Sequence, residues 1–176
     1  MGGAVLVGLF VASAYGRSAR VVRLRLHASI VLAGSKIQCS SAQEKGVTHI
    51  DCGVRGANGR PKLGGYVARM DARGRVRITA TSTSKVVFSR VPAVVTHKAT
   101  ATTVKVGDTI ELPGTSIHCE ATRIILAPTL ICYFVDKAGI AQPGSYTFAI
   151  SDTFVRTIGY NAKRDVQSGR SWKENG

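Results

Sequence analysis

Four cysteines in two equally spaced pairs constrain the fold of this chain more than any other feature of its 176 residues. Twelve residues separate Cys39 from Cys52, and twelve separate Cys119 from Cys132. An offset of eighty residues places the second pair on the first without a gap. Identical residues elsewhere follow the same offset: Ile30 and Ile110, Leu32 and Leu112, Gly34 and Gly114, Ile37 and Ile117, Gly59 and Gly139, Gly64 and Gly144, Tyr66 and Tyr146, Ile78 and Ile158. Such a period indicates two copies of one structural unit, made by internal duplication.

Both copies have the sequence character of short β-strands. Val, Ile and Thr are abundant and aromatic residues make up only 6% of the chain, which suits a pleated sheet better than a helix. Short apolar runs are bounded by turn pairs such as Asn58-Gly59 and Pro143-Gly144, and no convincing 3.6-residue period interrupts them. The sequence therefore predicts an all-β fold of two tandem modules, each a small sandwich-like or barrel-like unit closed by one disulfide.

The equal spacing also predicts how the cysteines pair. If each pair flanks a hairpin, its two Cα atoms come within the distance that a disulfide requires, and pairing within each copy is favoured over the two other connectivities. The alternatives are a zinc site that includes His49 or His118, and free thiols. Structural zinc prefers cysteines two to four residues apart, and the repeat leaves no cysteine over to act as a reactive thiol.

The ends and the middle of the chain differ in character from the two modules. Residues 1–14 read as a signal peptide, because an apolar run from Ala4 to Ala12 ends in the small-residue pattern Ala12-x-Ala14. No Lys or Arg precedes this run, so an uncleaved anchor or a buried first strand are the alternatives. The predicted organisation is a signal peptide (1–14), a basic β module (17–80), a linker or extra strands (81–98), a second β module (99–160) and a flexible polar tail (161–176).

Export would place the protein in an oxidising compartment, either secreted or in the cell envelope, where disulfides persist. The apolar run is shorter than the roughly 20 residues that a helix needs to span a bilayer, so no transmembrane helix is expected in the mature form.

Positive charge is concentrated in the first copy. The chain carries a formal charge of +14, and residues 17–98 hold sixteen Lys and Arg against three acidic residues, while residues 99–176 hold eight against seven. Arginines alternate at Arg23 and Arg25 and again at Arg73, Arg75 and Arg77, so each set projects from one face of its strand. If these strands are neighbours, the five side chains form a stripe that could bind phosphate or carboxylate groups. Alternatively, they only solvate the sheet and protect its edges, and a GC-rich genome would also enrich arginine.

No catalytic pattern is present, and no cofactor or metal is expected. The motifs G-x-S-x-G, H-E-x-x-H and the P-loop are absent, and no histidine of one copy is matched by a histidine in the other. The expected function is therefore that of a non-enzymatic secreted or surface protein. It would serve structurally or bind an extracellular polyanion such as a wall polymer, lipopolysaccharide or DNA.

Two other functions remain open. The first is an extracellular enzyme or enzyme inhibitor, with loops 41–48 and 121–128 carrying the specificity and the apolar run 124–126 serving as a protein contact or as part of the core. The second is a subunit of an extracellular filament or shell that assembles through exposed strand edges.

Overall fold

The computed structural model describes residues 19–56, 62, 65–80, 101–137, 146–159 and 166–171, and all regular secondary structure in these ranges is β. The all-β prediction is thus confirmed. The strands are β1 (Val21–Arg23), β2 (Ser29–Leu32), β3 (Ile37–Glu44), β4 (Val47–Val54), β5 (Tyr66–Asp71), β6 (Val76–Ala80), β7 (Thr102–Val104), β8 (Thr109–Glu111), β9 (Ile117–Ile124), β10 (Ala127–Phe134), β11 (Tyr146–Ile150), β12 (Phe154–Gly159) and β13 (Val166–Ser171). The predicted signal peptide (1–14) and the predicted linker (81–98) lie outside the described residues.

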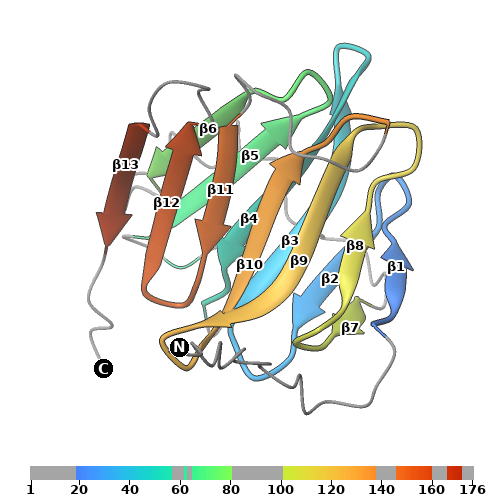
Figure 1. The fold of residues 1–176 in the computed structure, drawn as a ribbon. Coiled ribbons are helices and arrows are strands. Elements are labelled where there is room, and N and C mark those ends of the chain that lie inside the picture. Colours follow the sequence, from blue (N-terminus) through green and yellow to red (C-terminus); the bar gives the residue numbers. More distant parts are fainter. Residues whose placement is uncertain are drawn as a thin grey trace, which may run out of the picture.

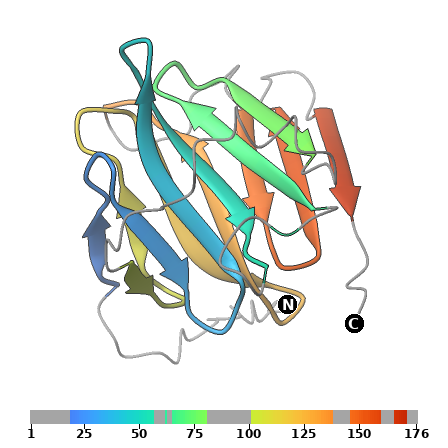
Figure 2. The same ribbon diagram turned by 180° about the vertical axis from the view of Figure 1, so that it is seen from behind.

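The strands form two sheets that face each other (Figure 1, Figure 2). Sheet A has seven strands in the order β1-β8-β9-β10-β11-β12-β13, and sheet B has six in the order β6-β5-β4-β3-β2-β7. Within each sheet most neighbours are antiparallel and consecutive along the chain, because short turns join them. Each sheet is therefore built almost entirely from one half of the sequence.

The first strand of each half is the exception, since it lies in the sheet of the other half. β1 pairs in parallel with β8, placing Val22 opposite Ile110, and β7 pairs in parallel with β2, placing Thr103 opposite Val31. The side chain of Arg20 strengthens the first of these junctions by donating to Oδ2 of Asp108 at 2.8 Å. We call this arrangement the strand exchange. It makes the two halves interdependent, which the prediction of two tandem modules does not include.

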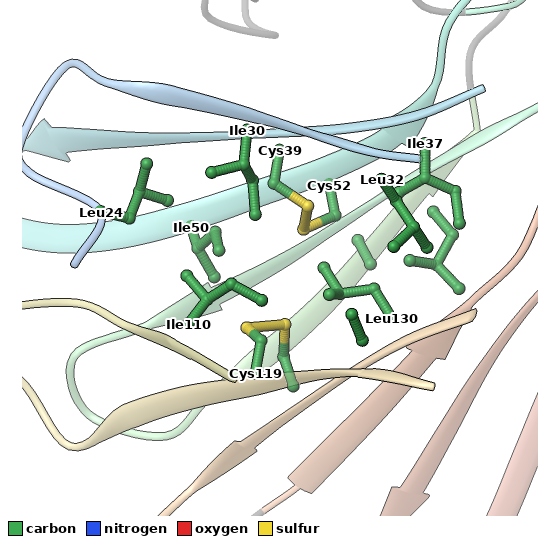
Figure 3. Close-up of a cluster of buried hydrophobic side chains, with 14 of the residues drawn as sticks. Leu24, Ile30, Leu32, Ile37, Cys39, Ile50, Cys52, Ile110, Cys119 and Leu130 are labelled. Carbon is green, nitrogen blue, oxygen red and sulfur yellow. A yellow bond between two sulfur atoms is a disulfide. The ribbon is translucent and has the colours of Figure 1, made fainter. Parts of the chain in front are cut away.

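One apolar core lies between the sheets and contains both disulfides. Ile30, Ile37 and Ile50 from sheet B pack in the same buried cluster as Ile110 and Leu130 from sheet A, and Figure 3 shows them converging on the two sulfur bridges. The cysteines bond as predicted, within each half, because each pair occupies directly opposed positions on two antiparallel strands: Cys39 with Cys52 on β3 and β4, and Cys119 with Cys132 on β9 and β10.

The two halves also share unusual backbone conformations at the eighty-residue offset. Positive φ occurs in four matched pairs of positions, even where the residue types differ: His27 and Gly107, Gly34 and Gly114, Lys45 and Ile125, Gly46 and Leu126. This agreement is consistent with the duplication that the sequence indicates.

The last two pairs of positions form two-residue turns that close the β3–β4 and β9–β10 hairpins. The prediction of loops at 41–48 and 121–128 is therefore wrong, because the strands of each hairpin run directly up to its two turn residues. Polar and mixed residues in these segments extend the hairpins beyond the core, where sequence alone suggests a loop.

A second correction concerns the C-terminal region. Residues 166–171, which belong to the predicted flexible tail, form β13 and pair antiparallel along the whole of β12. Backbone hydrogen bonds can add such an edge strand regardless of side-chain polarity, so a search for apolar runs does not detect it. Among the described residues, no helix has the length and apolar character needed to cross a bilayer.

Candidate functional site

The five arginines predicted to bind anions fall into two separate groups. Arg23 lies in β1 and Arg25 just after it, at the edge of sheet A. Arg73, Arg75 and Arg77 lie in the β5–β6 turn and in β6, at the edge of sheet B. The two edges are on opposite sides of the molecule (Figure 1, Figure 2), so the single stripe expected from neighbouring strands does not form. The strand exchange is the reason, because it places β1 in sheet A while β6 lies at the edge of sheet B.

One of the three arginines near the β5–β6 turn is already paired. Nε and Nη2 of Arg75 lie 2.8 and 2.7 Å from Oδ2 of Asp71. Oδ1 of Asp71 accepts hydrogen bonds from the backbone N–H groups of Arg73 and Arg75, so this carboxylate stabilises the turn. The side chains of Arg73 and Arg77 are exposed and have no carboxylate partner in the part of the chain that the structure describes.

These arginines border a hollow of about 640 Å³ on sheet B, which we call the basic pocket. Its lining residues come from the end of the β3–β4 hairpin and from the β5–β6 turn, and both of these turns lie at the upper end of the ribbon in Figure 1. Five cationic side chains and two carboxylates contribute to its lining: Lys45, Arg69, Arg73, Arg75, Arg77, Glu44 and Asp71. The excess of positive charge and the forked guanidinium groups suit an anionic ligand.

A buried ionic network supports the basic pocket from the face of β4 and β5 that points away from the core. The strand register places Asp51 opposite Arg69. Nε and Nη2 of Arg69 donate to the two carboxylate oxygens of Asp51 at 2.6 and 3.0 Å, and Nη1 donates to Glu44 at 2.6 Å. The side chain of Asp51 is only 2% exposed. Because a buried carboxylate is costly unless it is paired, Arg69 is held in place by the charge that it neutralises.

His49 is part of the same network, and both of its ring nitrogens face protein groups. Nε2 lies 3.3 Å from Oδ2 of Asp51 but is not aligned with it for a good hydrogen bond. Nδ1 lies 3.4 Å from the carbonyl oxygen of Val47. A general base must reach a substrate proton, so these contacts favour a structural role for this buried ring. The described residues contain no group of three side chains suited to hold a metal ion.

The network holds its carboxylates in the ionised form. Burial opposes ionisation of Asp51, but the contacts with His49 and Arg69 outweigh it and hold the pKa of Asp51 below its ordinary value. Partial burial likewise opposes ionisation of Asp71, and hydrogen bonds from the Arg75 side chain and the turn amides outweigh it, so its pKa is also lowered.

These lowered pKa values predict a loss of stability in acid. A carboxyl group whose pKa is lower in the folded state stabilises the protein above its unfolded pKa, near 4, and this contribution disappears as the pH falls through the folded value. We expect the urea midpoint to be constant near neutrality and to fall below about pH 4. The Asp51→Asn variant should be less stable than the wild type at pH 7, and its stability should fall less than that of the wild type on acidification. Acid profiles of variant and wild type that run parallel would contradict this role of Asp51.

The sequence did not predict a role for Asp51, Arg69 or Glu44, although part of the signal was present. The patterns His49-x-Asp51 and Arg69-x-Asp71 each place two titratable residues on one face of a strand. Which carboxylate meets which arginine depends on the register between β4 and β5, and neither composition nor spacing gives that register.

The second half of the chain lacks this network. At the eighty-residue offset, the five residues Glu44, His49, Asp51, Arg69 and Asp71 correspond to Ile124, Thr129, Ile131, Ala149 and Ser151. None of these replacements carries a charge, although the strands that hold them have the same order and pairing. The shared scaffold therefore does not require the ionic network, which is specific to the first half.

No protein-family model matches the chain, and no match was found to a curated protein or to a solved structure. The chemistry of the site itself is therefore the evidence for function.

Proposed function

We propose that this protein is a non-enzymatic binding protein of an oxidising compartment and that its basic pocket binds a polyanion. The observation that carries the proposal is the pocket itself, in which Arg73 and Arg77 present exposed guanidinium groups beside three further cations. A guanidinium group binds phosphate, sulfate or carboxylate through two parallel hydrogen bonds.

Two further features support a specific site over a diffuse positive surface. Arg69 is held by two hydrogen bonds to the buried Asp51, so part of the pocket wall is already ordered before a ligand arrives. The uncharged residues at the matching positions of the second half show that the fold alone does not demand these charges. The pocket is also open at the surface and includes residues of β6, the edge strand of sheet B, which suits a repeating polymer more than an enclosed small molecule.

The disulfides support the choice of compartment, because such bonds persist in secreted and cell-envelope proteins. A polyanion met there would be an anionic wall polymer, lipopolysaccharide or extracellular DNA. These ligands share closely spaced phosphate or carboxylate groups.

The test is retention on immobilised heparin as a function of salt. Replacing Arg73 and Arg77 by Gln should lower the salt concentration of elution and reduce the slope of log K against log salt by roughly 1.5, as expected for two lost contacts. The matched control is Arg23→Gln with Arg25→Gln, which removes the same charge at the edge of sheet A. Equal losses in both double variants would mean that net charge alone drives retention, and the assignment of the pocket would then be wrong.

A further inference from the structure

The β9–β10 hairpin ends in an apolar tip that the fold does not use. Ile125 and Leu126, the two turn residues, are 94% and 84% exposed. The other exposed large apolar side chains among the described residues, Val21, Leu26 and Val106, are between 42% and 52% exposed. Of the two interpretations of this run that the sequence left open, burial in the core is excluded for Ile125 and Leu126.

The backbone at this tip is also unfavourable for the residues that occupy it. Ile125 has φ 47° and Leu126 has φ 66°. A β-branched residue is rarely found at positive φ, and turns of this kind normally contain Asn, Asp or Gly. The matching turn of the first half follows this preference at its second position, where Gly46 comes after Lys45. The second half thus keeps two large apolar side chains where both solvent exposure and backbone conformation disfavour them, which points to a function for the exposed side chains.

Three basic residues lie at the same end of the molecule as the tip. Pro128 lies next to Gly34 of the β2–β3 turn, because a Cβ atom added to Gly34 would be 3.9 Å from Cγ of Pro128. In that turn, the backbone N–H of Lys36 donates to Oδ1 of Asp152. The backbone carbonyl oxygen of Lys36 accepts a hydrogen bond from the backbone N–H of Arg55. The exposed residues Lys36 and Arg55 therefore lie at the same end of the molecule as Arg123, which pairs with Pro128 across the hairpin. Figure 1 shows the β2–β3 turn and the β9–β10 turn together at the lower end. Asp152 is the one acidic residue in this set of contacts.

We propose that this tip inserts into the surface of an anionic lipid membrane, with Lys36, Arg55 and Arg123 near the headgroups. Two side chains can bury only a small fraction of the roughly 800 Å² per partner that a stable protein–protein interface requires. Insertion at a lipid surface needs no such area, because apolar side chains enter the acyl boundary while nearby cations attract anionic headgroups. The exposed apolar residues of the tip match the acyl boundary, and the cations behind them match the anionic headgroups.

The tip is remote from the basic pocket. The turn of the β3–β4 hairpin, which contributes to the pocket lining, lies at the upper end of the ribbon in Figure 1, and the β9–β10 turn lies at the lower end. The lipid proposal therefore does not depend on polyanion binding, and each can fail without the other.

The test is sedimentation with vesicles of equal parts phosphatidylglycerol and phosphatidylcholine at low salt. The variant Ile125→Asn with Leu126→Gly removes both apolar side chains and supplies residues suited to the turn. It should fold with a higher urea midpoint than the wild type and partition into vesicles at least about 100-fold less. Leu26→Asn, at the turn between β1 and β2, is the matched control and should retain the wild-type partition coefficient. Heparin retention should be unchanged in both variants.

Three results would overturn the proposal. Wild-type protein that does not sediment with these vesicles would show that the tip does not bind lipid. Sedimentation that persists in the variant Ile125→Asn with Leu126→Gly would show that charge alone is responsible for the binding. If the wild type instead self-associates in vesicle-free solution and the variant is monomeric, the tip is a contact between copies of the chain.

Discussion

Replacing all four cysteines by alanine is expected to lower the free energy of unfolding by roughly 6 kcal/mol. Each disulfide joins residues thirteen positions apart, and closing a loop of that length stabilises a protein by about 3 kcal/mol in the chain-entropy model. The two loops do not overlap in sequence, so their contributions should add. Because domains are typically stable by only 5–15 kcal/mol, the quadruple variant should be marginally folded at best.

Urea denaturation of three variants checks this expectation. Each of the two double variants should lose about half of the total stabilisation free energy, because the loops are equal in length and all four side chains are buried. These variants are Cys39→Ala with Cys52→Ala, and Cys119→Ala with Cys132→Ala. A quadruple variant within about 2 kcal/mol of the wild type would show that the hairpins are already restricted in the unfolded chain.

The Arg69→Ala variant should have the second large effect, a loss of about 3–5 kcal/mol in the free energy of unfolding. Its cause is the carboxylate of Asp51, which would keep its burial and lose both hydrogen bonds from the guanidinium group. Deletion of an exposed ion pair would cost less than about 1 kcal/mol, so the size of the loss distinguishes the two situations.

The second half of the chain supplies the control for this experiment. Its uncharged pair, Ile131 and Ala149, occupies the positions that match Asp51 and Arg69. The double variant Asp51→Ile with Arg69→Ala should therefore be more stable than Arg69→Ala alone, and within about 1.5 kcal/mol of the wild type. A double variant that is less stable than the single one would contradict the assignment of the loss to an uncompensated charge.

The sequence predicted those parts of the fold that depend on spacing and on local turn chemistry. The offset between Cys39 and Cys119 predicted both disulfides, since it placed each cysteine pair at equivalent positions in two similar units. Strands such as β11 and β12 show the local signals on which the all-β prediction depends, namely short apolar segments bounded by turn residues. The backbone agreement between His27 and Gly107 could not be read from residue type, since only one of the two is a residue that favours positive φ.

Other features depend on contacts between residues far apart in the chain. β1 and β7 are three residues long, and nothing in such short segments says which sheet they join. The pocket was only partly predicted for the same reason. The alternation of Arg73, Arg75 and Arg77 predicts one set of cations, whereas the pairing of Asp51 with Arg69 depends on the register between two strands. The exposure of Ile125 also depends on how far the hairpin extends beyond the core.

The strand exchange has a consequence for any chain that contains only one of the two repeats. Such a chain would carry a first strand with no sheet of its own to join and, beside β2 or β8, an open edge of unpaired backbone groups. Two half-length chains could complete each other by trading these strands, and their stability would then depend on protein concentration. Joining the repeats in one polypeptide removes that dependence, because each strand is permanently tethered near its acceptor.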